Sequence, residues 1–259
     1  MYRQPRDRHP VVAATCCALL QFVLTLGILL VGKALLPHEQ FGKVKLVAFA
    51  STLLLPIVLA QLLGLWRNIG LGRPRAWLFT FVALMTCVPF LTLGLRVPPD
   101  TTIAGAFTIQ AINAVAEELL FRGVIFALLI RLPVGRALLI NGVLFGAMHL
   151  LHGVMDGDWA AAGHQALITV LGGLLFAALR AETGSLWPPI LVHMLLNLSV
   201  IFSNGEAARV TGTLDIADIV SRAMQFALFL WVVHRSTRAG RPHAPRLNGR
   251  RLPDNYKAR

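Results

Sequence analysis

The chain has 259 residues, of which 56% are hydrophobic and only 14% are charged, and its mean hydropathy is +0.67. A soluble domain carries about 25% charged residues. The composition therefore excludes an ordinary soluble protein and predicts a chain embedded in a bilayer, where each buried ionisable group is costly. The net charge of +12 does not indicate nucleic-acid binding, because the basic residues lie mainly in the termini and in short loops between apolar runs.

Eight apolar runs follow one another, each close to the length of about 20 residues that crosses a bilayer core. They span residues 11–32, 46–66, 76–95, 104–131, 135–152, 163–181, 186–203 and 216–234. Glycine and proline separate several of them, as Pro98 and Pro99 do before the fourth run. We therefore predict an all-α fold, a polytopic transmembrane bundle of about eight helices. We expect three helices within 1–104, a membrane core over 105–203, a last helix within 204–234 and a basic, disordered tail over 235–259.

The distribution of Lys and Arg predicts the orientation. If both termini lie inside, most of the 24 basic residues fall on the inner side, with Arg180 among those counted in inner loops. The three lysines of the first outer loop, Lys33, Lys43 and Lys45, are exceptions. We therefore expect both termini in the cytoplasm, and we interpret the compact basic chain as a bacterial inner (plasma) membrane protein.

The fourth run, AINAVAEELLFRGVIFALLI, carries Glu117, Glu118 and Arg122. Glu118 and Arg122 are four residues apart, so they share a helix face and can form an ion pair. Glu117 points about 100° away from Glu118 and is the carboxylate freer to act as a general base on water. The plainer interpretation is that the three residues only hold helices together, but one arginine neutralises only one of the two carboxylates.

Two later runs add further polar residues. The fifth ends with Phe145 and His149 on one face, and the seventh has His193 and Asn197 four residues apart. A histidine near a helix end is more often interfacial, and an asparagine in a membrane helix usually bonds to another helix. Together, however, His193 and Asn197 can point two donors at one spot, as stabilisation of an oxyanion requires.

In this order, EELLFR (Glu117 to Arg122), FGAMH (Phe145 to His149) and HMLLN (His193 to Asn197) resemble the type II CAAX prenyl endopeptidase and bacteriocin-processing family, whose pattern is EExxxR, FxxxH, HxxxN. The resemblance covers about 105–200. It implies an eight-helix bundle in which Glu117 and His149 activate the attacking water. It also implies that His193 and Asn197 stabilise the oxyanion, that Arg122 holds Glu118, and that Phe145 lines the site.

The implied activity is hydrolysis of a peptide bond near the C-terminal end of a membrane-anchored or lipidated protein or peptide. In a bacterium, a membrane-anchored precursor is a more plausible substrate than a prenylated protein. A zinc-dependent mechanism is an alternative, with Glu117, His149 and His193 as the metal ligands; the glutamate-type mechanism, which needs no cofactor, is favoured. The rival function is an ion- or proton-coupled transporter that uses the same Glu, Arg and His residues as a relay.

Overall fold

The structure is a computed structural model that describes residues 9–37, 41–99 and 101–238. Of the tail predicted to be disordered, 235–259, residues 235–238 are helical and the rest lies outside the described residues. Within these ranges the chain is helical, and its one β-type pairing is an isolated bridge between Leu95 and Ser203. The helices are α1 (Pro10–Leu35), α2 (Phe41–Leu62), α3 (Trp77–Leu84), η2 (Met85–Cys87), α4 (Val88–Leu91), α5 (Ile103–Glu118), η3 (Leu119–Ile125), α6 (Phe126–Leu129), α7 (Val134–Ala147), η4 (Met148–Leu150), α8 (Leu151–Asp156), α9 (Trp159–Thr183), α10 (Trp187–Ile201), α11 (Gly205–Val210) and α12 (Thr213–Arg238).

Some neighbouring helices continue one another as single rods, namely α3–η2–α4, α5–η3–α6 and α7–η4–α8. Together with α1, α2, α9, α10 and α12, they give eight rods in the described part of the chain, one for each predicted run; α11 is an additional short helix. The predicted all-α membrane bundle is thus confirmed. Four of the rods are long and apolar enough to cross a membrane: α1, α7–η4–α8, α9 and α12.

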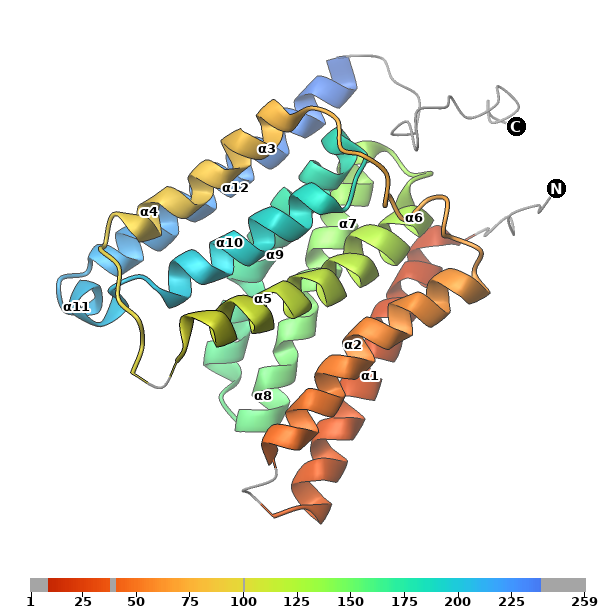
Figure 1. The fold of residues 1–259 in the computed structure, drawn as a ribbon. Helices are drawn as coiled ribbons and strands as arrows, with labels where there is room; N and C mark the ends of the chain where they lie inside the picture. The colour runs from red at the N-terminus through yellow and green to blue at the C-terminus, as the bar shows by residue number, and fades with distance from the viewer. Residues whose placement is uncertain (1–8, 38–40, 100, 239–259) are drawn as a thin grey trace, which may run out of the picture.

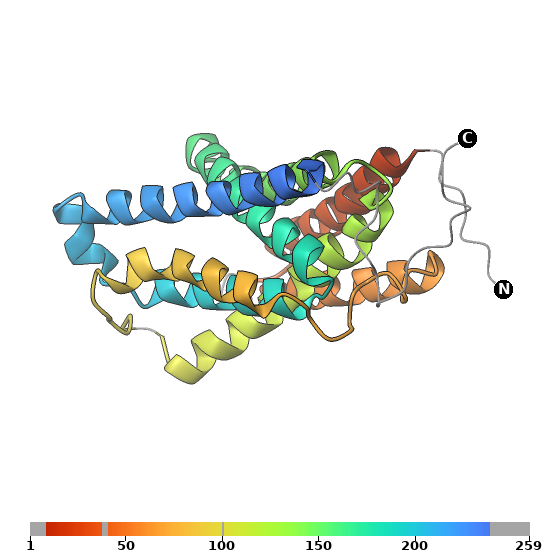
Figure 2. The same cartoon turned by 90° about the horizontal axis from the view of Figure 1, so that it is seen from above.

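The rods run up and down, so the start of α1 and the described end of α12 lie at the same end of the bundle (Figure 1). On one side, α10 and α12 both pack against the α3–η2–α4 rod, and on the other side α1 and α2 pair with each other (Figure 2). The rod α5–η3–α6 passes between these groups and contacts α1, α2 and α10. Every residue of η3 is buried, which puts Arg122 in the interior of the bundle.

Arg180 does not lie in a loop, as the sequence had led us to expect. We expected it in an inner loop, but it lies in the last turns of α9 and its side chain is fully buried. Its Nε donates to the backbone oxygen of Arg122 at 3.1 Å, and its Nη2 donates to that of Asn68 at 2.9 Å. The loop that contains Asn68 folds over the end of α9, and this contact converts a residue expected at the interface into an internal one.

Close packing of α7 on α9 depends on glycine. Gly142 and Gly146 are four residues apart on α7, the spacing that lets two membrane helices approach closely. A Cβ on Gly146 would meet the Val170 side chain and would lie 2.6 Å from the backbone oxygen of Ala166. A Cβ on Gly173 of α9 would lie 3.0 Å from the Cα of Gly142. The two backbones therefore leave no room for a side chain at this crossing, which sets the separation of the helices that carry His149 and Arg180.

We predict that Gly146→Val destabilises the bundle by about 1–3 kcal/mol, because a backbone carbonyl cannot move aside cheaply. The change should appear as a lower melting temperature of the purified protein in detergent. Gly163→Ala, on the same helix pair but with open space around the position, is the matched control and should melt no earlier than wild type. Equal melting of Gly146→Val and wild type would contradict the close approach of α7 and α9.

Candidate active site

Glu118, the last residue of α5, is the point at which three elements meet. Its Oε1 accepts from Nη1 of Arg122 in η3 at 3.0 Å and lies 2.9 Å from Nδ1 of His193 in α10. The side chains of Glu118 and Arg122 are fully buried, and that of His193 is 5% exposed. A carboxylate paired with Arg122 is an acceptor, so Nδ1 of His193 carries the proton of this hydrogen bond. The structure therefore places Glu118 as the partner that fixes both a cation and an imidazole.

The backbone that positions this pair is a π-helical turn. It begins at Leu119, directly after Glu118, and replaces the usual i to i−4 bonding with wider turns, a feature found often at functional sites. Side chains of other helices bind its carbonyl groups: Asn141 Nδ2 donates to the Phe121 oxygen at 2.7 Å, and Arg180 donates to the Arg122 oxygen. Arg122 itself reaches across to the Gly173 oxygen at 2.9 Å. α7 and α9 thus hold the turn in place.

Glu117 is the accessible carboxylate of the two. Its side chain is 25% exposed, and its Oε2 lies 3.7 Å from Nε2 of His193. His193 therefore stands between the two glutamates, with Nδ1 bound to Glu118 and Nε2 facing Glu117. Because Glu118 is occupied by its two partners, Glu117 is the carboxylate available to a third group.

His149 approaches the same region from the rod α7–η4–α8. Its Nδ1 lies 3.2 Å from the Phe145 oxygen. Since a carbonyl only accepts, this contact assigns the proton to Nδ1 and leaves Nε2 as the free nitrogen of the neutral ring. His149 lies within electrostatic range of Glu117 and of His193. The neighbouring His152, by contrast, is exposed and faces Asp156 at 4.0 Å.

Phe145 is the aromatic centre of the cluster. Its ring is edge-on to those of His149 and His193, at centroid distances of 5.5 Å and 6.0 Å. The Arg122 guanidinium lies 4.3 Å from the centroid of the Phe145 ring. Phe176 of α9 stacks on His193 at 4.7 Å. The two rings leave His193 little freedom to rotate, and Phe145 presents its electron-rich face to the buried cation.

Asn197 lies one turn after His193 on α10. Its Nδ2 donates to Oε1 of Gln110 on α5 at 2.9 Å, which uses one of its two amide hydrogens. The second hydrogen remains for another acceptor. Asn197 is therefore on the same helix as His193, and its side chain is fixed by a contact to α5. The other five predicted polar residues form one cluster with Phe145: Glu117, Glu118, Arg122, His149 and His193.

Sequence reasoning missed four residues of this arrangement: Gln110, Asn141, Phe176 and Arg180. Asn141 was the one with a usable signal, since a lone amide inside an apolar run has to find a partner. Gln110 carries the same signal at the outer half of the fourth run. Phe176 looks like any other core aromatic residue in the sequence, and Arg180 falls at the end of its apolar run.

The ligands of the alternative zinc mechanism, Glu117, His149 and His193, do not form a metal-ligand group in the described structure. Among the described residues, no three His, Cys, Asp or Glu side chains converge closely enough to hold an ion. Of these residues, His193 is bonded at Nδ1 to Glu118 and His149 at Nδ1 to a backbone oxygen, which leaves Nε2 of each ring on the side of the site.

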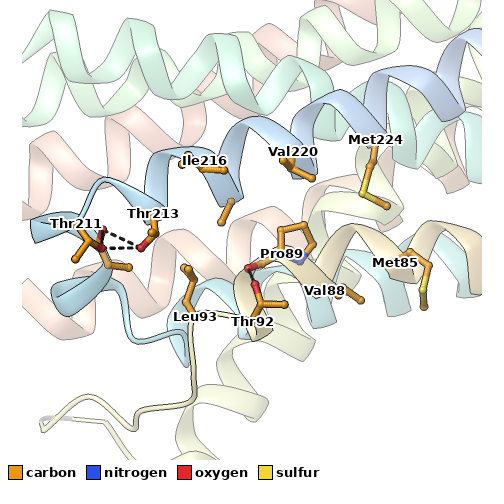
Figure 3. A pocket seen from close by; sticks show the side chains of 12 residues that line it. Met85, Val88, Pro89, Thr92, Leu93, Thr211, Thr213, Ile216, Val220 and Met224 are labelled. Carbon is orange, nitrogen blue, oxygen red and sulfur yellow. Dashed lines mark hydrogen bonds between the residues drawn. The ribbon is translucent and has the colours of Figure 1, made fainter.

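A separate cavity of about 810 Å³ lies between the α3–η2–α4 rod and α12. Apolar side chains such as Met85, Val88, Val220 and Met224 form most of its wall, with Thr213 near one end (Figure 3). None of the residues of the polar cluster lines it. We therefore assign the candidate site to the buried cluster and not to this groove.

Comparison with known proteins agrees with the motif analysis. The "Putative membrane peptidase YdiL" of Bacillus subtilis (strain 168) is 29% identical over 158 residues, which is 55% of this chain and 60% of that protein. This chain thus matches less than two thirds of the length of that relative. The family described as "Type II CAAX prenyl endopeptidase Rce1-like" matches residues 99–199, the segment that contains every residue of the cluster. The predicted family resemblance is therefore confirmed where the site is built: residues 99–199 of this membrane protein match the Rce1-like family of type II CAAX prenyl endopeptidases.

Proposed function

We propose that this protein is an intramembrane endopeptidase that hydrolyses a peptide bond of a membrane-anchored protein or peptide near its C-terminal end. The observation that carries this proposal is the buried series Arg122–Glu118–His193 beside the accessible Glu117. A purely structural ion pair needs only Glu118 and Arg122. The additional imidazole between two carboxylates, with His149 close by, supplies both a base and a donor.

The mechanism follows from the contacts of each group. Glu117, assisted by His149, takes a proton from water, and the oxygen attacks the carbonyl carbon of the scissile bond. With a second proton on its ring, His193 donates from Nε2, and Asn197 donates its remaining amide hydrogen, to the oxyanion of the tetrahedral intermediate. Glu118 does not touch the reacting atoms; through Nδ1 it orients His193 and stabilises its protonated form. When the intermediate collapses, the proton held by Glu117 passes to the departing amine.

The membrane placement is part of the proposal. We place the end of the bundle that holds the start of α1 and the described end of α12 in the cytoplasm of a bacterial cell, following the charge distribution. The substrate then reaches Glu117 from within the bilayer, because the cluster lies inside helices and not on a loop.

We expect Glu117→Gln and His149→Ala to reduce cleavage about 10²–10⁴-fold, since each removes a general acid–base group. The assay follows proteolysis of candidate membrane-anchored proteins by the purified chain in liposomes. Glu182→Gln and His152→Ala are the matched controls, because Glu182 pairs with Arg235 at the surface and His152 is exposed. Unchanged cleavage by the Glu117 variant would refute the assigned site. If wild type cleaved no candidate and the same substitutions abolished proton or ion flux across the liposome membrane, the transporter would be favoured.

Gln110 should act through Asn197. Removing its acceptor oxygen with Gln110→Leu frees the Asn197 amide to rotate, so we expect kcat to fall about tenfold or more while KM changes little. In an Asn197→Ala background the same change should cost nothing further, because the two residues form one unit. Additive losses in this double-mutant cycle would show that Gln110 has only a packing role.

Because the expected zinc ligands do not converge, we predict that cleavage survives chelation. Wild-type protein dialysed against a strong chelator should retain its rate, and added Zn²⁺ should not increase it. Loss of activity on chelation, followed by recovery with Zn²⁺ alone, would overturn the glutamate-type mechanism proposed here.

A further inference from the structure

A second pocket, of about 520 Å³, lies at the basic end of the bundle. Its walls are the loop between α2 and α3 and the turn between α9 and α10, and its lining includes Trp66, Arg73, Pro74, Arg75 and Thr183. The volume falls in the range of about 300–1,000 Å³ that is typical of small-ligand sites. None of the residues that build the candidate active site lines this pocket.

Hydrogen bonds between the two walls hold the pocket open in a fixed shape. The Ser185 hydroxyl donates to the Gly72 oxygen at 2.7 Å, and the Arg75 backbone N–H donates to the Thr183 oxygen at 2.9 Å. The Trp187 indole donates to the Leu71 oxygen at 3.2 Å. A loop tied at successive residues is preorganised, so a ligand need not order it on binding.

The pocket is positively charged and its charge is not neutralised from within. The side chains of Arg73 and Arg75 are exposed, and neither forms an ion pair within the described residues. The nearest acidic neighbour in sequence to the lining residues, Glu182, is already bound by Arg235 at 3.1 Å. An anion that enters the pocket therefore meets two arginines without a competing carboxylate.

A third positive charge lies under the loop. The Arg180 guanidinium packs directly against Gly70, whose φ of +93° and lack of a Cβ make room for it. Its hydrogen-bond partners are two backbone oxygens, and its Nη1 is buried without a hydrogen-bond partner in the described part of the chain. Besides these carbonyl groups the guanidinium faces the Phe126 ring at 5.7 Å, and no salt bridge to a carboxylate neutralises it within the described residues. Such a buried cation raises the potential above it and favours a negative ligand in the adjoining pocket.

Three exposed tryptophans mark the depth of the pocket in the membrane. Trp66 lines it, Trp77 begins α3, and Trp187 begins α10, with exposures of 40%, 47% and 50%. Tryptophan side chains concentrate at the level of lipid headgroups. The pocket thus opens where phosphate groups of the surrounding lipids are present at high local concentration.

We propose that this pocket binds the phosphate-bearing headgroup of an anionic phospholipid, with Arg73 and Arg75 as its direct partners and Arg180 as a buried source of positive potential. Basic pockets at the cytoplasmic ends of membrane helices suit such headgroups. The proposal does not depend on the peptidase activity. It gives the loop between α2 and α3 a ligand that ties it to the turn before His193.

The test is a titration of the purified full-length protein in mixed micelles with phosphatidylglycerol, followed by its melting temperature. We expect a saturable rise for wild type, and none with phosphatidylcholine. In the double variant Arg73→Gln/Arg75→Gln, the apparent Kd should increase about a hundredfold, since each charge-assisted contact accounts for about a factor of ten. Arg136→Gln removes an exposed charge at the same end of the bundle, outside the pocket, and should leave the Kd unchanged.

The other outcomes overturn the proposal. An equal loss in Arg136→Gln would mean that general surface charge attracts the lipid. Equal protection by soluble glycerol 3-phosphate would identify a free phosphate ligand and not a lipid, and protection by a peptide with a free C-terminal carboxylate would identify a substrate site. If the double glutamine variant failed to fold, Arg73→Lys/Arg75→Lys would replace it. This variant keeps both charges, so it should retain binding within a few-fold, and its complete loss of binding would also contradict the assignment.

Discussion

A carboxylate inside an apolar helix bundle is tolerated only when its charge is paired and its oxygens accept hydrogen bonds. Arg122 and His193 meet this requirement at one oxygen of Glu118, Oε1, which they approach from two different elements, while Oε2 is buried without a hydrogen-bond partner among the described residues. Many of the surrounding contacts fix the position of Glu118 or of its two partners. The π-helical turn positions Arg122, and the Gly173 oxygen accepts a hydrogen bond from Nη2 of this arginine. Two phenylalanine rings restrict the rotation of the His193 imidazole.

The two adjacent glutamates differ in burial and in bonding. Glu118 is fully buried and bonded to Arg122 and His193, whereas Glu117 keeps a quarter of its side chain exposed. Two neighbouring residues of the same type thus acquire different environments, and in acid–base enzymes different environments give carboxylates different roles. His193 lies between the two, with Nδ1 bonded to Glu118 and Nε2 facing Glu117.

Sequence predicted the fold well because lipid imposes a simple requirement of length and apolarity. All eight runs became rods, and boundary differences are a few residues, as at α12, which begins at Thr213 and not at 216. The i, i+4 relation of Glu118 and Arg122 was also visible, since it needs only one helix. Contacts between distant runs were not: Gln110 with Asn197 and Arg180 with the Arg122 oxygen depend on how rods cross. Nothing in the letters LLFRGVI predicts a π-helical turn.

That turn has a consequence for how the chain tolerates changes in length. Each residue of an ordinary helix rotates the chain by about 100°, so a widened turn acts as an extra residue accommodated without breaking the rod. Deleting one residue within Leu119–Ile125 would let the rod revert to a regular helix, and it would shift Arg122 relative to Glu118 while leaving the flanking helices and the apolar character of the rod intact. The chain would still have helices long and apolar enough for the bilayer but would lose the present pairing of its buried arginine with Glu118. Membrane insertion and chemistry are therefore separately encoded in this one rod, the first by composition and the second by the number of residues in a single loop of backbone.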